Sequence, residues 1–385
     1  MARKLYTITP LTAIHIGTGD ELTFLDYKIA SSGENEEEKY IKFSNDRILQ
    51  RLMEDEQERT AFERASVNGN MAELQKFFQD NCTCENDIDY RCEITGDFSK
   101  TYNENLDKDP HENAAKVLQM YRAQGTPYPV IPGSSLKGSI RTALLNKYLD
   151  DLSDGDYEHL HKNFELEKNL DKANNLLQQK LLDYSDAKND PLRAVAIPDC
   201  SFKANGTQLV GGLKLVSLSL DPLETQIQAE VIKGELLGGS AAAELCISID
   251  DKLQKTPFSL RREDRPKCLK TIQFDDIHKS CNDFYWDEFK KEYDKFYKNV
   301  NDGTTELIVK LKNRLEEAMT KGQFIIRVGR WSQVEFVTLE KNFRKPKTKK
   351  DKFGKPIGYG KTRTLFNYDG KYLPMGWCVL SEKEE

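Results

Sequence analysis

The chain of 385 residues contains 31% charged and 38% hydrophobic residues, with a mean hydropathy of -0.68 and a net charge of -6. No apolar run reaches membrane-spanning length and no signal-peptide core follows the first residues, so we expect a cytoplasmic protein with no membrane partner. The length suffices for two domains with separate cores, and the eight cysteines are interpreted as reduced thiols because no export signal precedes them.

The N-terminal quarter is predicted to begin with strands and to continue into polar helices. Residues 3–16 have the pattern of a strand, and Phe24 to Ala30 with Tyr40 to Phe43 predict a hairpin. A short helix is expected over Asp46 to Leu52, with Ser44 or Asn45 as its N-cap. Helical patterns follow from Glu54 to Phe78 and from Asn113 to Arg122, so residues 46–125 are interpreted as a helical insertion.

The segment Pro132 to Arg141 predicts a helix that opens on a glycine turn and continues to Leu149. Gly133 and Gly138 flank two N-cap candidates, Ser134 and Ser135, while Lys137 and Arg141 lie one turn apart. A helix N-terminus presents unpaired N–H groups, so this combination predicts a cradle for phosphate. An ordinary capped helix is the alternative.

Two familiar phosphate-binding loops do not fit the chain. A Walker A loop has its lysine after the second glycine, whereas Lys137 precedes Gly138. The run His15-Ile16-Gly17-Thr18-Gly19 begins like a dinucleotide fingerprint, but Leu22 stands where a third glycine is needed and no helical pattern follows. An NTPase and a Rossmann domain are therefore disfavoured.

Strands are expected to return in the middle of the chain after a second helical insertion. That insertion, residues 150–190, contains a long polar helix over 166–184. Short strands are predicted over Val195 to Phe202, Leu213 to Leu220, Gln226 to Lys233 and Ala243 to Ile249. The glycines 234, 238 and 239 further indicate a hairpin from Val231 to Leu245.

The C-terminal part is predicted to hold a helical block over 275–321 and final strands over Phe324 to Gly329 and Trp377 to Leu380. Strands and helices are mixed rather than alternating, which indicates an α+β protein. We expect two ferredoxin-like or RRM-like domains with helical insertions and glycine-rich loops, over residues 1–222 and 223–385.

Basic residues are concentrated near the C-terminus. Residues 341–363 contain ten Lys or Arg and one acid, Asp351, which gives +9 here and leaves -15 for the rest. Within this tail, Tyr359 lies between two glycines and precedes Lys361 and Arg363, so the backbone can approach RNA while the ring offers a stacking face. A flexible, solvated lysine loop is the alternative for 345–355.

Three motifs in this order resemble the RAMP superfamily of CRISPR-associated RNA-binding proteins. They are the strand Leu5 to Leu11 running into 15–19, the loop 132–138, and the glycine-rich C-terminal segment. Within the superfamily, residues 360–365 and 373–377, together with Asp190-Pro191-Leu192-Arg193 and Asp199, are similar to the fifth subunit of type III-A Csm effector complexes. The helical insertions lie outside this resemblance.

The resemblance implies a non-catalytic subunit, without a cofactor, that caps the 3′ end of a guide RNA and supports its maturation in antiviral defence. Its implied partners are the guide RNA, target RNA near the guide 3′ end, Csm-type backbone and small subunits, and recruited host nucleases. The RNA contacts are expected at His15, Gly17, Gly19, Gly133, Ser134, Ser135, Lys137, Gly138, Arg141, Arg193, Arg344, Tyr359, Lys361 and Arg363.

Two other functions and one metal site remain open at this point. His15 is the candidate general acid or base of a guide-processing RAMP endoribonuclease, although it could equally bond a backbone carbonyl or stack on a base. A purely structural end cap is the third possibility. Cys82, Cys84 and Cys92, with His111, could bind zinc, but C-x-C lacks the usual two-residue gap, so no metal is predicted and free thiols are preferred.

Overall fold

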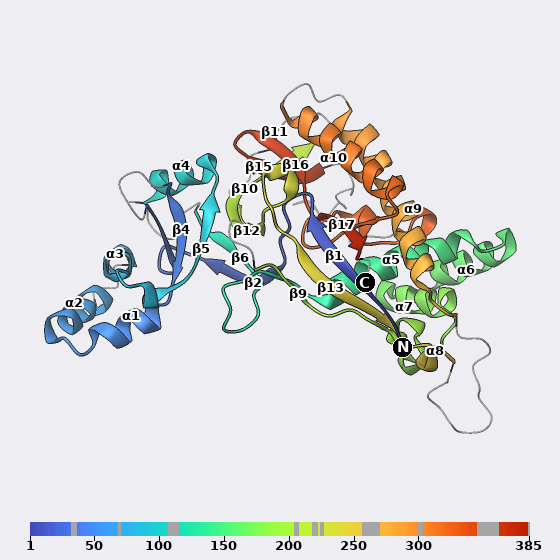
Figure 1. Cartoon of the computed structure of the whole chain (residues 1–385), viewed down its shortest axis with the longest axis horizontal. Helices are drawn as coiled ribbons and strands as arrows, with labels where there is room; N and C mark the ends of the chain where they lie inside the picture. The colour runs from blue at the N-terminus through green and yellow to red at the C-terminus, as the bar shows by residue number, and fades with distance from the viewer. Residues whose placement is uncertain are drawn as a thin grey trace.

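A computed structural model describes residues 1–31, 37–67, 71–106, 115–203, 208–217, 222–223, 227–255, 270–298, 303–344 and 362–383. Within these ranges, strands and helices are mixed along the chain, and the predicted α+β class is confirmed. The two termini lie in the same part of the molecule, because the first and last strands pair with each other (Figure 1).

The first sheet has five antiparallel strands in the order β14-β17-β1-β13-β8. Their bounds are β1 Ala2–Pro10, β8 Val195–Ala196, β13 Ala243–Ile249, β14 Phe324–Arg327 and β17 Trp377–Glu382. In β1, Tyr6 and Ile8 alternate with more exposed residues, so one face of this strand enters the core. The pairing register of β1 with its two neighbours follows this alternation. Ile8 lies opposite Ala243 of β13 and Leu380 of β17.

The second sheet follows the order β2-β6-β12-β10-β5-β4-β3, and β10 and β15 link it to further short strands. Its bounds are β2 Gly17–Leu22, β3 Tyr27–Ala30, β4 Lys39–Phe43, β5 Ile88–Ile94, β6 Val117–Met120, β10 Gln208–Ser217, β11 Pro222–Leu223, β12 Gln228–Ile232, β15 Thr362–Tyr368 and β16 Lys371–Pro374. A third, two-stranded sheet pairs β7 (Val130–Ile131) with β9 (Cys200–Ser201).

The helices gather mainly at the two ends of the molecule (Figure 1). The bounds are α1 Asn45–Leu52, α2 Glu56–Val67, α3 Met71–Asn81, α4 Gly96–Asn105, α5 Gly133–Asp150, α6 Asp154–Leu166, α7 Leu170–Leu181, α8 Asp251–Lys255, α9 Phe274–Glu292 and α10 Gly303–Thr320. Short helical turns are η1 Glu85–Asp87, η2 Ala187–Asn189, η3 Pro191–Ala194, η4 Glu235–Leu237, η5 Tyr293–Tyr297, η6 Val334–Phe336 and η7 Lys341–Phe343. None of the helices in the described ranges has the length and apolarity needed to cross a membrane.

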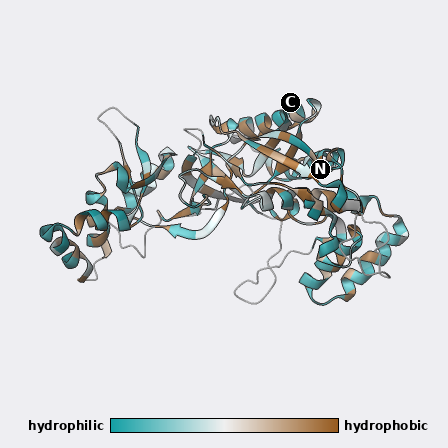
Figure 2. Ribbon diagram, turned by 60° about the horizontal axis from the view of Figure 1, so that its bottom comes forward, coloured by the Kyte–Doolittle hydropathy of each residue, from teal (hydrophilic) through white to brown (hydrophobic). Residues whose placement is uncertain are grey.

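The main core lies between the first sheet and the helices α5 and α9. Leu136, Ile140, Ala143 and Leu144 recur at helical spacing on the buried side of α5 and join Tyr6 of β1 in one cluster. Hydrophobic residues accordingly follow the central strands, whereas hydrophilic residues predominate on the outlying helices (Figure 2). The strands of the first sheet and its two covering helices follow one another as β1, α5, β8, β13, α9, β14 and β17, which contains a βαββαβ pattern with β14 as an added edge strand.

Several predicted elements are confirmed. Strands β3 and β4 form the expected hairpin, and the helical block over 275–321 corresponds to α9, η5 and α10. The N-cap of α1 is Ser44, whose hydroxyl accepts a hydrogen bond from the N–H of Arg47 at 3.4 Å. The polar helix expected over 166–184 is α7, preceded by the separate α6.

Two predicted elements are wrong, and a neighbouring sheet explains each. The helix expected over Asn113 to Arg122 is a strand in its described part, because β6 pairs with both β2 and β12. The hairpin expected from Val231 to Leu245 does not form, because β12 joins the second sheet while β13 pairs with β1. The first strand is also shorter than 3–16, since the chain bends at Leu11 and continues as β2.

Both large sheets draw strands from both sides of the predicted boundary between residues 222 and 223. The first sheet places β1 between β13 and β17, and the second places β10 between β12 and β5. The boundary therefore does not coincide with a division between sheets, and residues 218–221 beside it lie outside the described part of the chain. The division into two ferredoxin-like domains stays a prediction.

Candidate nucleic-acid interface

The helix α5 begins at Gly133, and this glycine packs directly on the chain that follows β8. A Cβ at this position would lie 2.0 Å from the carbonyl oxygen of Ile197. The N–H of Gly133 donates to Asp199 Oδ1 at 2.8 Å, so a carboxylate of the protein already binds at this helix N-terminus. Pro132 is the N-cap, and the expectation that Ser134 or Ser135 caps the helix is wrong.

The two cations of the predicted cradle are held by the protein itself. Lys137 donates to the carbonyl oxygen of Val195 at 2.8 Å, and burial lowers the pKa of this lysine. Arg141 forms an ion pair with Asp190 at 2.7 Å, and its guanidinium also donates to Gln178. These side chains brace α5 against α7, β8 and the segment between them, and they do not stand as mobile cations beside the helix N-terminus.

His15 is fully buried and positions the chain around it. Its Nδ1 lies 2.8 Å from the carbonyl oxygen of Glu230, as one of the sequence alternatives proposed, and its ring centroid is 5.1 Å from that of Trp331. The carbonyl oxygen of His15 accepts the N–H of Arg330 at 2.8 Å. With no exposed surface, the His15 ring reaches neither a base for stacking nor an RNA hydroxyl in this conformation.

Acidification should destabilise the fold through His15. Burial lowers its pKa, with Arg330 and Arg122 acting in the same direction and Glu230 opposing them. The folded chain then binds fewer protons than the unfolded chain below about pH 6.5, so stability is complete above this pH and falls as the pH drops towards the folded pKa. Urea unfolding at about pH 7.5 and about pH 5.5 measures this loss.

The His15→Gln variant is expected to lose a large part of this pH dependence. His278 provides the comparison, because burial lowers its pKa as well. A His278→Gln variant should keep the share of the pH dependence that belongs to His15. An unchanged pH profile in His15→Gln would contradict the assignment.

A groove of ≈ 430 Å³ runs between the start of β2, the N-terminal half of α5 and the loop after β14. Gly17 contributes from β2, Ser135 and Gly138 from α5, and Gly329 and Arg330 from the loop. A Cβ on Gly17 would lie 2.9 Å from Nε2 of His15, so only glycine fits there without displacing the ring. Gly138 is exposed, and a Cβ there would meet no atom within 4 Å.

The loop after β14 holds an unusual backbone conformation beside this groove. Trp331 and Gln333 have φ of 65° and 68°, and Gly329 has φ of 92°. Non-glycine residues in this region are strained, and such strain clusters at functional sites. Arg330 is exposed, with its guanidinium 4.9 Å from the Trp331 ring, and makes no ion pair with any described residue.

Arg330 and Trp331 are absent from the residues predicted from the sequence. The sequence signal was the run Gly329-Arg330-Trp331 directly after an apolar strand, where a glycine, a cation and an aromatic ring adjoin. The expected strand instead ends at Arg327, and the loop begins two residues before Arg330.

The arginines of the predicted C-terminal site point inward. Arg363 is 2% exposed and forms ion pairs with Glu292 at 2.6 Å and Glu335 at 3.0 Å. Arg344 pairs with Glu288 at 3.3 Å. Tyr359, Lys361 and most of the basic tail lie outside the described residues.

The remaining candidates are dispersed. Gly19 is exposed at the edge of the second sheet with φ of 100°, and Ser134 is exposed on α5. Arg193 is half-buried on η3. Of the predicted set, the structure brings Gly17, Ser135 and Gly138 together at the groove.

The three cysteines considered for zinc do not converge. Cys82 is buried with the helices α1 and α3, while Cys92 is buried in the neighbouring cluster around Tyr27 and Tyr40. Burial raises the pKa of both thiols, which disfavours the thiolate that zinc requires. Within the described ranges no cluster of His, Cys, Asp or Glu could hold a metal, and His111 lies outside them.

The groove has the chemistry of a backbone-binding surface. It offers an exposed guanidinium on Arg330, the half-buried hydroxyl of Ser135, and glycines that let an extended ligand approach the main chain. In nucleic-acid complexes, groups of this kind bond phosphate and sugar and carry little information about base identity.

Comparisons with known proteins show the family through a family model and the fold through two solved structures. A model of the RAMP superfamily matches residues 7–352. A chain in the structure entitled "Cryo-EM structure of Csm-crRNA-target RNA ternary complex in type III-A CRISPR-Cas system" is 19% identical, with a TM-score of 0.61 over 99% of this chain and 100% of that chain. The crystal structure of T.onnurineus Csm5 is 18% identical, with a TM-score of 0.55 over 97% and 99%. No curated protein matches the chain.

Proposed function

The chain belongs to the RAMP superfamily, and on that premise we propose that it is a non-catalytic, RNA-binding subunit of a type III-A CRISPR effector complex. In this role it caps the 3′ end of the guide RNA and supports guide maturation. Its partners are the guide, target RNA near the guide 3′ end, Csm-type backbone and small subunits, and recruited host nucleases. The likeness over nearly full length to a chain of a Csm–crRNA–target RNA complex supports the choice of assembly.

The observation that carries the proposal is the groove beside α5. There, Arg330 makes no ion pair with any residue that the structure describes, and it lines the groove together with Gly17 and Gly138, which an RNA backbone can approach closely. Phosphate contacts of this kind fix the register of a single strand without reading its sequence. A subunit that holds the end of any guide needs this property, because guides differ in sequence.

The endoribonuclease alternative finds less support. A general acid or base must come within hydrogen-bond reach of the proton that it transfers, and His15 is fully buried behind Gly17 and Trp331. Direct measurement of RNA affinity distinguishes a purely structural cap from an RNA-binding cap.

Arg330→Gln is expected to weaken binding of the purified chain to single-stranded RNA about tenfold, because one charge-assisted phosphate contact is lost. The loss should be the same for unrelated sequences. The slope of log K against log salt should become shallower by about 0.7 for the lost contact. Fluorescence anisotropy with two labelled RNAs across a salt series measures both quantities.

Arg59→Gln is the matched control, since Arg59 is exposed on α2 at the opposite end of the molecule (Figure 1). This variant should bind RNA as the parent chain does. Equal losses in the two variants would mean that net charge, rather than the groove, determines affinity. A change in sequence preference at an unchanged salt slope would contradict backbone recognition.

A further inference from the structure

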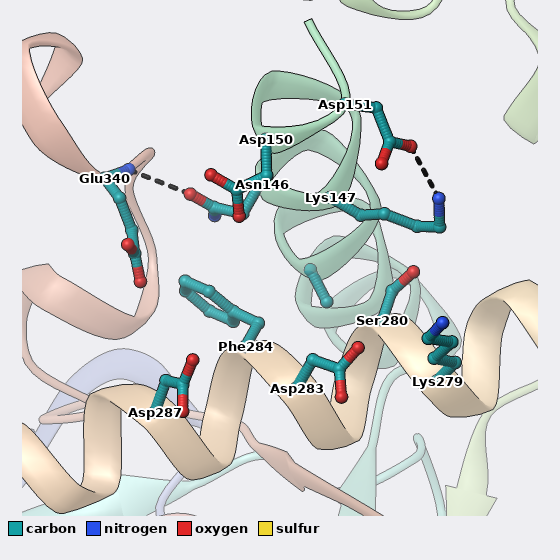
Figure 3. Close-up of a pocket in the computed structure, with 11 residues that line it drawn as sticks. Asn146, Lys147, Asp150, Asp151, Lys279, Ser280, Asp283, Phe284, Asp287 and Glu340 are labelled. Atoms are coloured by element: carbon teal, nitrogen blue, oxygen red, sulfur yellow. Dashed lines mark hydrogen bonds and ion pairs between the residues drawn. The ribbon is translucent and has the colours of Figure 1, made fainter.

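A second concave site lies at the C-terminal half of α5. Its charge is negative, whereas the groove at the N-terminal half carries the positive charge of Arg330. This acidic notch, ≈ 200 Å³ in volume, is the space between the C-terminal half of α5, α9 and Glu340. Figure 3 shows Asp283 and Asp287 rising from α9 toward α5, with Asp150 on α5 and Glu340 at the side. Its floor is partly apolar, because Ala143 and Phe284 are buried there beside the polar Asn146 and Ser280, while the carboxylates form the rim.

The acidic charge of the notch is only partly neutralised. Five carboxylates line it against two lysines, Lys147 and Lys279. Lys147 is engaged by Asp151 at 2.6 Å, Glu340 pairs with Lys291 at 3.0 Å, and Asp287 pairs with the exposed Lys290 at 2.7 Å. Asp283 has no ion-pair partner among the residues that the structure describes.

A buried hydroxyl in the notch also lacks a partner. Ser280 is 1% exposed, its Oγ forms no hydrogen bond, and its side chain is directed from α9 toward α5 (Figure 3). A buried polar atom without a partner is costly, so an unfilled hydrogen bond at this depth points to a ligand that supplies one. The neighbouring amide of Asn146 is satisfied, because it donates to Thr142 and accepts the N–H of Glu340.

These features select the chemistry of the occupant. Acceptors on the rim favour a donor-rich cation, and the apolar part of the floor suits the aliphatic stem that carries such a head group. The volume is below the range typical of metabolite pockets, so one side chain fits better than a free ligand. The carboxylates repel RNA phosphate, and the C-terminal end of the α5 dipole adds further attraction for a cation.

We propose that the acidic notch receives an arginine side chain from a neighbouring protein subunit of the assembly. The inference rests on the proposed function, because it requires that the chain work within a multi-subunit complex. Arginine is chosen over lysine because its planar fork of donors can bond two acceptors at once, such as the Asp283 carboxylate and the Ser280 hydroxyl one turn apart on α9. The two halves of α5 then serve different partners, RNA at the groove and protein at the notch.

The test is assembly of the complex from purified subunits and guide RNA, with incorporation of this chain followed by native mass spectrometry. Asp283→Asn with Asp287→Asn should raise the concentration needed for half-maximal incorporation at least about tenfold, because the partner arginine loses its counter-charges. The matched control is Glu54→Gln with Glu63→Gln. It changes the net charge equally at exposed positions near α2, and incorporation should be unchanged.

A photo-cross-link identifies the occupant. Lys279→p-benzoylphenylalanine places the reactive group at the rim, since Lys279 is exposed and lines the notch. We expect a cross-link to one neighbouring subunit, in a peptide that contains arginine. A cross-link to RNA, to a second copy of this chain or to a peptide without arginine overturns the proposal, as do equal losses in the two acid-neutralising variants.

Single-stranded RNA affinity of the isolated variants separates this inference from the proposed function. Asp283→Asn with Asp287→Asn should leave that affinity unchanged, because the notch lies apart from the groove. If this double variant binds RNA and enters the complex as the parent chain does, the proposal for the notch is wrong and the proposed function is unaffected. A parent chain that neither binds RNA nor enters the complex overturns the proposed function.

Discussion

Glu292→Gln is expected to lower the free energy of unfolding by about 3–5 kcal/mol, because it removes the only shared counter-charge of two buried guanidiniums among the described residues. Glu292 is 1% exposed at its side chain and pairs with Arg327 at 2.9 Å and Arg363 at 2.6 Å. Arg327 is itself fully buried at its side chain. Urea unfolding monitored by circular dichroism measures the change.

A graded series keeps this test informative even if Glu292→Gln folds poorly. Glu335→Gln removes one further partner of Arg363 at the edge of the network, where the carboxylate is 13% exposed, and should cost about 1–3 kcal/mol. Glu306→Gln breaks an exposed pair with Lys310 on α10 and should change stability little. Any other order of the three variants would contradict a buried network centred on Glu292.

This network also connects stability to the groove. Arg327 ends β14, and its carbonyl oxygen accepts the hydroxyl of Ser139 from α5 at 2.9 Å. Glu335 lies in the turn η6 that follows the strained loop of Arg330. Loss of the network should therefore loosen the loop and weaken RNA binding indirectly, at the same time as it lowers stability.

Gly138→Glu is expected to weaken RNA binding on the order of a hundredfold without destabilising the fold. The new carboxylate would project into the groove beside Arg330, where it repels phosphate and competes for the guanidinium. The backbone tolerates a side chain here, because a Cβ meets no atom within 4 Å and the position is helical. Fluorescence anisotropy with single-stranded RNA measures the loss.

Two matched variants separate charge from bulk at this position. Gly138→Ala should retain RNA binding and stabilise α5 by about 0.5–1 kcal/mol, because alanine loses less backbone entropy in a helix than glycine. Gly138→Gln has the size of the glutamate variant without its charge and should lose much less affinity. If all three variants bind RNA as the parent chain does, the strand does not pass through this groove.

The sequence by itself determined the local elements whose signals lie within one turn or one strand. Pro132 followed by Gly133 marked the start of α5, Ser44 was one of two candidate caps for α1, and the helical block expected over 275–321 contains α9 and α10. The order of glycine motifs also carried the family resemblance. Short apolar runs were ambiguous, and Val117 to Met120 became a strand because β2 and β12 supply its hydrogen bonds.

Only the tertiary structure decided which cations remain available for RNA. Arg141 pairs with Asp190 and Arg363 with Glu292, partners 49 and 71 residues away along the chain, so no local pattern predicts their neutralisation. Arg330 makes no ion pair in the described part of the chain, and it lines the groove from the strained loop after β14. Because burying a charge without a partner is costly, the cations that point inward are paired in the folded chain, and a cation without a partner lies at the surface.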